Sequence, residues 1–309
     1  MTKVFIDGSA GTTGLRIGER LESRNDIEII RLNEENRKDV SARKKAINEA
    51  DIVFLCLPDS AAIESVALCE NPKTVIIDTS TAHRTNPQWA YGFPELSKDF
   101  MENIKKSKRI ANPGCHASGF IALIYPLIEK GVLDKNAMLS CVSLTGYSGG
   151  GKKMIAEYEA EERCGCLEAP RQYGLAQNHK HLPEMTAVTG VKNPPAFMPI
   201  VGDFYSGMEV TVPLFPNMLK GGTIEDIKNI YKEKYNGPIV NFVEDFAENS
   251  FVTANKLSNK DSMEISVSGN EDRILLIARY DNLGKGASGA AVECMNIVLG
   301  TNIKEGLEL

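Results

Sequence analysis

The sequence predicts an α/β protein in two parts: a domain on a parallel sheet with helices on both faces, then an α+β domain with a mixed or antiparallel sheet. Three observations support this fold. A glycine-rich turn follows the first strand, strand and helix patterns alternate over the first hundred residues, and after Cys115 longer strands are separated by Pro- and Gly-rich connections. A chain of 309 residues has room for about two domains.

The first part reads as a regular alternation of short apolar strands and helices. The expected elements, in order, are a strand over Lys3–Asp7, a helix over Leu15–Ser23, a strand over Ile27–Leu32, a helix over Lys38–Glu49, a strand over Ile52–Leu57, a helix over Ser60–Cys69 and a strand over Thr74–Asp78. The strands are continuous apolar runs, as in a sheet covered on both faces. This βαβ pattern predicts a Rossmann-type domain.

The second part has longer strands, some of them alternating. We expect strands over Met138–Thr145, Gly207–Phe215, Ile239–Phe242 and Arg273–Tyr280. The last segment, Gly284–Val298, is rich in Ala and Gly and is predicted to form a helix that returns to the first domain. The expected nucleotide-binding domain therefore comprises 1–115 and 284–309, and 116–283 form the catalytic, substrate-binding and oligomerisation domain.

Composition excludes several classes of protein. The chain is 42% hydrophobic and 25% charged, which argues against disorder, and its net charge of −6 argues against a nucleic-acid or acidic-membrane binder. There is no secretory pattern, and the longest apolar stretch, Phe120–Ile128, is too short to cross a bilayer. Seven cysteines cannot all pair within one chain, and Cys164 and Cys166 lack the second pair of a structural zinc site. We therefore expect reduced thiols and a cytoplasmic location.

The turn after the first strand has the sequence G-S-A-G-T-T-G, with glycines at Gly8, Gly11 and Gly14. Glycines at this spacing allow a tight turn and a close approach of the backbone to a pyrophosphate, and the helix N-terminus then faces the phosphates. Such a turn can also be a solution to a packing problem alone, but its place between the first strand and a helix favours dinucleotide binding. No phosphate-binding loop of the P-loop type occurs.

The end of the second strand bears on the choice of cofactor. NAD-binding domains usually place an acidic residue there, whereas this strand ends at Arg31, followed by Asn33 and Glu34. A guanidinium suits a 2′-phosphate and favours NADP(H), although Arg31 could also be a solvated residue at a strand end.

Cys115 is the cysteine with a distinctive context. Pro113 and Gly114 predict a turn, and the apolar run that follows predicts a buried helix with Cys115 at or near its N-terminus. The helix dipole and free amides there favour the thiolate, and therefore a nucleophile. The alternative of an inert buried thiol fits four other cysteines in apolar patterns: Cys56, Cys69, Cys141 and Cys294. A thiolate in a nicotinamide enzyme indicates chemistry between an aldehyde and an acyl phosphate or acid.

Four histidines are available as acid or base. His179 and His181 lie in N-H-K-H-L-P-E-M, where H-x-H could be half of a metal site, but no third ligand is evident and we predict no metal. Acid–base catalysis or substrate orientation is the preferred interpretation. His116 follows Cys115 directly and is expected to point elsewhere on the helix. His83 is followed by Arg84, which is the better candidate for an anion ligand.

The motifs together resemble those of the N-acetyl-gamma-glutamyl-phosphate reductase family in its short form, within the wider aspartate-semialdehyde dehydrogenase group. The motifs that carry the resemblance are G-S-A-G-T-T-G at 8–14, L-C-L-P-D at 55–59, D-T-S-T-A-H-R at 78–84, Y-G-F-P-E-L at 91–96, A-N-P-G-C at 111–115, G-Y-S-G-G-G-K-K at 146–153, H-K-H-L-P-E at 179–184 and D-N-L-G-K-G-A-S-G-A-A at 281–291. The Y-G-F-P-E-L and N-P-G-C motifs together are specific to this family.

The resemblance implies NADPH-dependent reduction of N-acetyl-glutamyl 5-phosphate to N-acetyl-glutamate 5-semialdehyde and phosphate, a step of arginine biosynthesis. It implies Cys115 as the nucleophile and a histidine of the pair His179 and His181 as acid/base, with a preference for His179. It also implies that the glycine turn and the tail after Asp281 hold the cofactor. Together with Arg31 from the strand end, the expected cofactor-binding residues are Gly8, Ser9, Gly11, Thr12, Thr13, Gly14, Arg31, Pro58, Asn282, Gly284 and Gly286. The substrate-binding candidates are Arg84, Ser148 and Lys152.

The resemblance is incomplete at one place, and two other functions compete with it. The longer form of the family commonly has an Arg after S-G-x-G, where this chain has Lys152 and Lys153, so the partner oxygen is open and both lysines could be solvated. One rival is another semialdehyde dehydrogenase, acting on aspartyl phosphate. The other is a non-catalytic NADP-sensing regulator. The family is usually a homodimer or homotetramer that acts on a small molecule.

Overall fold

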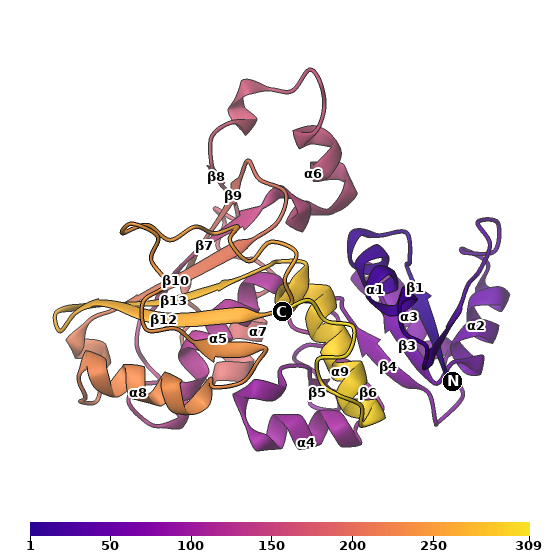
Figure 1. Ribbon diagram of the computed structural model, residues 1–309, viewed down its shortest axis with the longest axis horizontal. Coiled ribbons are helices and arrows are strands. Elements are labelled where there is room, and N and C mark those ends of the chain that lie inside the picture. Colours follow the sequence, from indigo (N-terminus) through magenta and orange to yellow (C-terminus); the bar gives the residue numbers. More distant parts are fainter. The chain divides into compact units, whose positions relative to one another are not determined.

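The computed structural model describes all of residues 1–309, and the chain divides into two compact units (Figure 1). The first unit comprises Met1–Gly114 and Ala287–Glu308, and the second comprises Cys115–Gly286 with Leu309. These boundaries lie within three residues of those expected at 115/116 and 283/284. The first unit is therefore formed by two separate pieces of the chain.

The first unit is built on a six-stranded sheet in which every paired strand is parallel. In spatial order its strands are β2 (Ile27–Ile30), β1 (Thr2–Asp7), β3 (Ile52–Leu55), β4 (Val75–Asp78), β6 (Arg109–Ala111) and β5 (Ala90–Tyr91). The chain goes from β1 to β2 on one side and then to β3 on the other. The carboxyl ends of β1 and β3 therefore form the switch point at which open α/β sheets bind ligands.

Helices cover both faces of this sheet, as the continuous apolar strands predicted. On one face pack α1 (Thr12–Glu22), α4 (Lys98–Lys106) and α9 (Gly289–Leu299). On the other pack α2 (Val40–Glu49) and α3 (Asp59–Leu68). The prediction that the last helix returns to the first unit is confirmed, because Val292 and Met295 of α9 are fully buried in its core.

The second unit contains a seven-stranded mixed sheet, as predicted. In spatial order its strands are β11 (Val240–Phe242), β12 (Met263–Asn270), β13 (Arg273–Tyr280), β10 (Met208–Leu214), β7 (Ser140–Gly146), β9 (Ala196–Gly202) and β8 (Arg171–Gln172). β12, β13, β10 and β7 pair antiparallel in succession, whereas β7–β9 and β11–β12 are parallel.

Three helices lie along this sheet, and a fourth projects from it (Figure 1). α5 (Cys115–Glu129) packs against β10 and β13, with α7 (Leu182–Thr189) and α8 (Ile224–Lys234) beside it. α5 is apolar around most of its circumference and is almost wholly buried, as predicted for the run after Cys115. α6 (Gly151–Tyr158) belongs to the projecting part near β8 and β9. Short 3-10 helices occur in both units: Pro94–Leu96 in the first, and Tyr147–Gly150, Gly165–Leu167 and Pro216–Met218 in the second.

The expected single helix over Gly284–Val298 is wrong in its first turn. Gly284–Ser288 form a π-helical turn, and α9 starts only at Gly289. The carbonyl of Asp281 accepts hydrogen bonds from the amides of both Gly284 and Gly286, and a Cβ on Gly284 would lie 1.9 Å from the carbonyl oxygen of Lys260. This close backbone packing imposes a wide turn that composition alone does not reveal.

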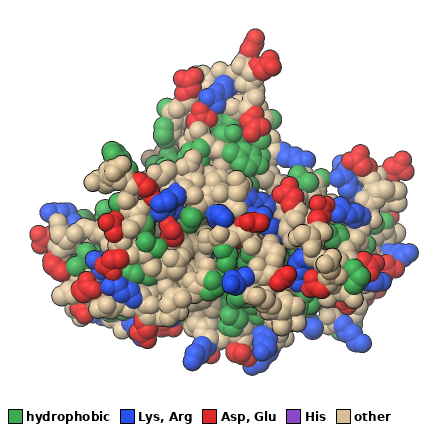
Figure 2. Space-filling model, in the orientation of Figure 1, with side chains coloured by type: hydrophobic (Ala, Val, Ile, Leu, Met, Phe, Trp, Pro, Cys, Tyr) green, Lys and Arg blue, Asp and Glu red, His purple; other side chains and the backbone are tan.

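The surface is mixed in charge. On the face shown in Figure 2, acidic and basic side chains alternate without a large field of one sign. None of the helices combines the length and the apolar character needed to cross a bilayer.

Candidate active site

The glycine turn forms a compact backbone cradle between β1 and α1. Gly8 has a φ of +89°, and a Cβ there would lie 2.3 Å from the carbonyl oxygen of Cys56. A Cβ on Gly14 would lie 2.4 Å from the carbonyl oxygen of Gly8. Side chains are therefore excluded at both positions, and the start of α1 approaches β1 closely. Ser9, Gly11, Thr12 and Thr13 complete the turn and the first turn of α1, and Gly11 is the N-cap.

A cavity of about 940 Å³ opens beside this cradle. The cradle and β2 line it, together with the segment that follows β2. Arg31 lies on that segment with its side chain 67% exposed, and it forms an ion pair with Glu22 at 3.0 Å. Three further cations that we did not select from the sequence line the same cavity: Arg37, Lys38 and Arg43, the last of which is paired with Asp7 at 3.0 Å. The N-R-K run soon after a strand end could have indicated the first two.

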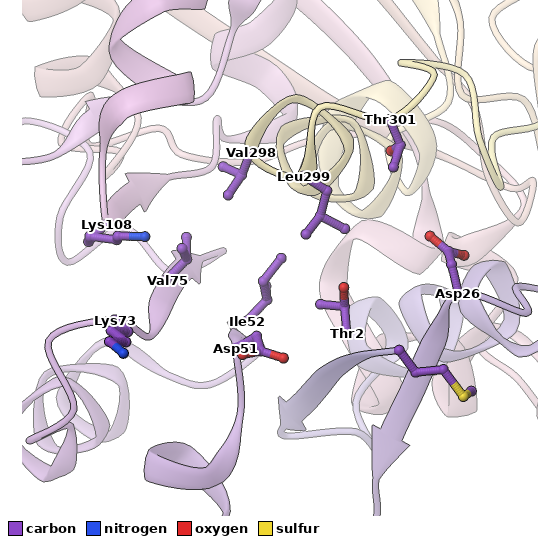
Figure 3. A pocket seen from close by; sticks show the side chains of 11 residues that line it. Thr2, Asp26, Asp51, Ile52, Lys73, Val75, Lys108, Val298, Leu299 and Thr301 are labelled. Atoms are coloured by element: carbon purple, nitrogen blue, oxygen red, sulfur yellow. The ribbon is translucent and has the colours of Figure 1, made fainter.

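A second cavity, of about 680 Å³, lies at the opposite end of the strands, where their amino ends meet (Figure 3). Residues at the amino ends of β1, β3 and β4 line it, together with Val298 and Leu299 of α9. Acidic and basic side chains, such as Asp51 and Lys108, both occur there. The first cavity, unlike this one, lies at the carboxyl ends of the strands, where parallel sheets bind ligands.

Arg84 and His83 have partners within the first unit. The Arg84 guanidinium is buried and donates to the carbonyl oxygens of Asn112 and Thr79, each at 2.9 Å. His83 Nδ1 lies 2.6 Å from Asp78 Oδ2. Arg84 thus supports the turn that precedes Cys115, and its predicted contact with a substrate anion would be made in addition to these bonds.

Asn112 lies at the start of that turn and is fully buried. Its Nδ2 donates to the carbonyl oxygen of Ala287 at 3.0 Å, while its Oδ1 has no hydrogen-bond partner within the chain. A buried acceptor of this kind is costly unless it is satisfied, so it indicates a place for a donor from a ligand or water.

Cys115 is the first residue of α5, which confirms its predicted position at a helix N-terminus. Its carbonyl oxygen accepts a hydrogen bond from the Tyr280 hydroxyl at 2.6 Å, and that hydroxyl accepts from the amide of Gly119 at 3.0 Å. The hydroxyl therefore bridges two backbone groups in the first turn of α5. Gly286 packs closely against Cys115, since a Cβ there would lie 3.2 Å from Cys115 Cβ.

His116 lies among the other histidines, contrary to the expectation that it points elsewhere. Its ring centroid is 5.9 Å from that of His179 and 5.7 Å from that of His181. Its Nδ1 lies 2.6 Å from Ser143 Oγ, and its Nε2 lies 2.7 Å from the Tyr173 hydroxyl. The physical reason is tertiary: β7 and the segment around β8 bring these partners to the start of α5.

The electrostatics of this cluster favour neutral side chains. Burial, and then the charge of nearby His179, lower the pKa of His116 to about 3. Burial, and then the charge of Lys180, also lower the pKa of His179. Burial, followed by the charge of Cys115, raises the pKa of Tyr173. His116 is therefore a neutral hydrogen-bonding residue at pH 7.

His179 and His181 differ in their surroundings. His179 is partly exposed, and its Nδ1 accepts a hydrogen bond from the backbone amide of His181 at 3.2 Å. That bond leaves Nε2 as the atom of His179 that can exchange a proton with a ligand. His181 is buried at the N-cap of α7, and its ring centroid lies 4.7 Å from that of His179.

The remaining predicted residues fall in several places. Asn282 and Ser148 are in contact: Asn282 Nδ2 donates to Ser148 Oγ at 3.0 Å, and Asn282 Oδ1 accepts from the amide of Gly207 at 2.9 Å. Lys152 lies exposed in the first turn of α6. Pro58 is the N-cap of α3.

Sequence reasoning did not select Ser143 or Tyr173. Both contact His116, from positions 27 and 57 residues away in the chain. No local motif marks them, because their importance comes from the packing of the second sheet against α5. No group of three or more His, Cys, Asp or Glu side chains is arranged to hold a metal ion.

In comparisons with known proteins, both units match domains of one enzyme family. Residues 3–104 match the semialdehyde dehydrogenase NAD-binding domain, and residues 115–282 match the semialdehyde dehydrogenase dimerisation domain. The chain is 45% identical to N-acetyl-gamma-glutamyl-phosphate reductases of Brucella ovis and Brucella suis, in each case over 96% of this chain and 99% of the relative.

Solved structures of lower identity share the fold. Aspartate semialdehyde dehydrogenase II of Vibrio cholerae, complexed with ASA, matches with a TM-score of 0.73 and 15% identity, over 97% of this chain and 98% of the other. The Candida albicans aspartate semialdehyde dehydrogenase with NADP matches with a TM-score of 0.71 and 14% identity, over 98% and 99%. At 45% identity over nearly its whole length, the chain belongs to the N-acetyl-gamma-glutamyl-phosphate reductase family, within the semialdehyde dehydrogenases.

Proposed function

We propose that this chain reduces N-acetyl-glutamyl 5-phosphate to N-acetyl-glutamate 5-semialdehyde and phosphate with NADPH, a step of arginine biosynthesis. The observation that carries the proposal is the thiol of Cys115 at the first position of α5, in a unit that also gathers three histidines. The names of relatives 45% identical to this chain support the choice of substrate.

Cys115 is the proposed nucleophile. The N-terminus of α5 would stabilise a thiolate through its amides and dipole, and the Tyr280 hydroxyl fixes the first turn that carries it. The thiolate attacks the acyl carbon, the bond to phosphate breaks, and a thioester forms on the sulfur. Later collapse of the reduced adduct restores the thiol and releases the aldehyde.

His179 is the proposed acid/base, with His181 as the alternative. Its Nε2 is available for proton transfer, and its lowered pKa keeps it neutral at pH 7, ready to accept a proton. We propose that His116 acts through its neighbours as a positioning residue. It is buried and neutral, and Ser143 and Tyr173 hold both of its ring nitrogens.

The first unit fits a dinucleotide. The cradle at Gly8 and Gly14 would admit a pyrophosphate only because no Cβ fills it, and the adjoining cavity is large enough for an adenosine moiety. Arg31, Arg37 and Lys38 would hold a 2′-phosphate, which favours NADP(H) over NAD(H). The cofactor, when bound, supplies the hydride that reduces the thioester.

The proposed contacts with the substrate are less specific. The candidates for binding its polar and anionic groups are Ser148, Lys152 and Arg84. The surroundings of each side chain limit how it can contact the substrate. Ser148 is engaged by Asn282, Arg84 by two carbonyls, and Lys152 reaches from an exposed turn as a point charge. For the cofactor, the further proposed contacts are Pro58, Asn282, Gly284 and Gly286.

The proposal is tested by assay in the oxidative, phosphate-dependent direction with NADP⁺. We expect faster turnover of N-acetyl-glutamate semialdehyde than of aspartate semialdehyde; the reverse preference would instead identify an aspartate-semialdehyde dehydrogenase. A non-catalytic regulator would bind NADPH and turn over neither compound.

The second test concerns the nucleophile. Cys115→Ser should lower kcat by at least about a thousandfold and leave the affinity for NADPH unchanged, because serine at the same helix N-terminus remains protonated. The matched control is Cys69→Ser, a partly exposed cysteine of the first unit, which should retain full activity. Activity in the Cys115→Ser enzyme would refute the thioester mechanism.

We further propose that the enzyme is a cytoplasmic homo-oligomer, a dimer or a tetramer, without a nucleic-acid or membrane partner. The name of the dimerisation domain that 115–282 match supports the assembly, and seven free cysteines suit a reducing compartment. Light scattering coupled to size-exclusion chromatography should give a mass at least twice 33.8 kDa; a monomer would contradict the proposal.

A further inference from the structure

The sequence C-G-C at Cys164–Cys166 takes no part in the chemistry proposed above. It lies between α6 and β8, in the part of the second unit that projects from the sheet (Figure 1). Both cysteines are free and exposed, unlike Cys141 and Cys294, which are buried. Two exposed thiols separated by one glycine are a feature that neither the fold nor the proposed reaction requires.

The two cysteines lie in one turn and are inequivalent. Cys164 is the N-cap of the 3-10 turn Gly165–Leu167, and its Sγ accepts a hydrogen bond from the backbone amide of Cys166 at 3.2 Å. Donation from the Cys166 thiol, then from its amide, lowers the pKa of Cys164, whereas the same contact raises the pKa of Cys166. One thiol thus gains thiolate character while its neighbour stays protonated.

Both ends of this segment are anchored. Arg163 forms an ion pair with Asp203 at 2.6 Å and donates to the Tyr158 carbonyl oxygen at 3.0 Å. Arg171 donates to the Tyr158 hydroxyl at 3.0 Å, and its guanidinium lies 5.3 Å from the centre of that ring. Because the ends are fixed, the two sulfurs stay close without a large entropic cost of loop closure.

The surroundings also leave the two thiols accessible to a small reagent. The charge of Arg171 stabilises thiolates at both cysteines. A Cβ added to Gly165 would meet no atom within 4 Å, so the segment faces open space. Leu167, directly after the pair, is buried against Tyr158 and Val201 and holds the turn to the unit.

We propose that Cys164 and Cys166 form a thiol–disulfide exchange site for low-molecular-weight disulfides such as glutathione disulfide. The Cys164 thiolate attacks one sulfur of the reagent, whose S–S bond breaks and releases one thiolate. Cys166 then loses its proton and attacks Cys164 Sγ, which releases a second thiolate and leaves a Cys164–Cys166 disulfide. One disulfide is reduced to two thiols, and two protein thiols are oxidised to one disulfide.

A disulfide between residues two apart closes a small ring, and exposed or strained disulfides are easily reduced. The site therefore works in both directions, as a reversible modification set by the ratio of thiol to disulfide. The proposal does not depend on the proposed reductase function, because its readout is the covalent state of the two sulfurs.

The test uses the full chain in a Cys115→Ser background, which removes the other thiol at a helix N-terminus. After incubation with glutathione disulfide and alkylation of free thiols, trypsin cleavage after Arg163 and Arg171 releases a peptide that contains both cysteines and no others. We expect this peptide to carry an internal disulfide that dithiothreitol reverses.

Single variants distinguish the two roles. In the Cys166→Ser variant the reaction should stop at a glutathione adduct on Cys164. The Cys164→Ser variant should form no disulfide, and its remaining thiol should react with glutathione disulfide at least about tenfold more slowly. Cys69→Ser is the control and should behave as the parent. An unmodified peptide in excess glutathione disulfide, an adduct that builds up on Cys166 instead, or a disulfide between two chains would overturn the proposal.

Discussion

Arg31 is the side chain on which the proposed preference for NADPH depends. It lies on the rim of the cavity beside the glycine turn and is held by Glu22 in an exposed ion pair. Such pairs contribute little stability, so the guanidinium is available to a ligand anion at small cost. Arg37 lies nearby and pairs with Glu34.

We predict that Arg31→Ala raises the KM for NADPH about tenfold or more and changes the KM for NADH by less than about twofold. The reason is that a charge-assisted hydrogen bond to a phosphate contributes about 1.5–3 kcal/mol, and NADH has no 2′-phosphate. Steady-state kinetics with each cofactor measures both values. The charge control is Lys45→Ala, on α2 and outside the cavity. An equal effect on both cofactors would exclude Arg31 from the phosphate site.

Tyr173 is the residue that holds His116 from the far side of the cluster. Its hydroxyl lies 2.7 Å from His116 Nε2, and His116 itself is buried. Tyr173→Phe keeps the ring and removes this one partner, which leaves a buried ring nitrogen unsatisfied.

We expect Tyr173→Phe to lower the free energy of unfolding by about 1–3 kcal/mol, measured by urea denaturation. It should also lower kcat more than it changes KM, because the histidine cluster loses its orientation and not its access to substrate. Tyr205→Phe is the matched control, since Tyr205 is 42% exposed, and it should change stability by less than about 0.5 kcal/mol. Unchanged stability and kcat in Tyr173→Phe would remove it from the positioning role.

At the residue scale, the sequence was a good guide to Cys115 and a poor one to its neighbours. A turn followed by an apolar run is a local signal, and it correctly placed the thiol at a helix N-terminus. His116 was misjudged because helix geometry says where a side chain points relative to its own helix. It does not say which distant segment, here the one carrying Tyr173 and His179, packs against that face.

At the scale of elements, the first sheet was predicted better than the second. Continuous apolar runs marked β3 and β4 without any knowledge of their neighbours. β9 was missed because Pro199 lies inside it, although β9 pairs with strands on both sides. α8 could have been found, since Thr223 and Asp226 form a capping box at its start.

The close packing at the turn between β1 and α1 predicts that substitution of two glycines in the same helix has opposite effects on stability. A Cβ on Gly14 would lie 2.4 Å from a backbone oxygen, which cannot yield, whereas a Cβ on Gly18 would meet only the tip of Ile6 at 4.0 Å. Both glycines lie in α1, Gly14 in its first turn and Gly18 in its interior, so helix propensity favours alanine at both.

We expect Gly14→Ala to destabilise the first unit by about 1–3 kcal/mol and to weaken NADPH binding, because the cradle must open. Gly18→Ala should instead stabilise the protein by roughly 0.5–1 kcal/mol, through helix propensity. Urea denaturation and fluorescence titration with NADPH measure the two effects. Equal stabilities of the two variants would contradict the close approach of α1 to β1.

At the scale of the whole molecule, the chain crosses between its units at Gly114–Cys115 and at Gly286–Ala287, and its last residue, Leu309, groups with the second unit. Residues next to both crossings belong to the proposed site: the turn before Cys115, and Gly286, which packs against Cys115. The sequence predicted that the first unit is formed by two separate pieces of the chain, because a Gly-rich helical segment follows the last strand. The π-helical turn at the second crossing was not, because it depends on Asp281 and on the backbone of Lys260.

The stability of the whole molecule should depend on pH through groups with depressed pKa values. His116 has its pKa lowered to about 3 by burial and by His179, against about 6.5 in an unfolded chain. The hydrogen bond from Lys256, together with those from Arg279 and the backbone, lowers the pKa of Glu248 to about 2. In both cases the unfolded chain binds the proton first. The contribution of each group to the free energy of unfolding is therefore complete above its pKa in the unfolded chain. It is lost as the pH falls towards its pKa in the folded protein.

We therefore predict that the free energy of unfolding is highest near neutral pH and falls below about pH 6.5, by about 1.4 kcal/mol per pH unit for the proton on His116. A second decline should begin below about pH 4.5, when Glu248 is protonated on unfolding. Urea denaturation at a series of pH values measures the curve. His116→Gln should flatten the limb between pH 6.5 and 4.5, whereas Glu248→Gln should leave that limb unchanged and reduce the later one. If His116→Gln keeps the full slope above pH 4.5, the buried neutral histidine at the start of α5 is not what makes the molecule acid-sensitive.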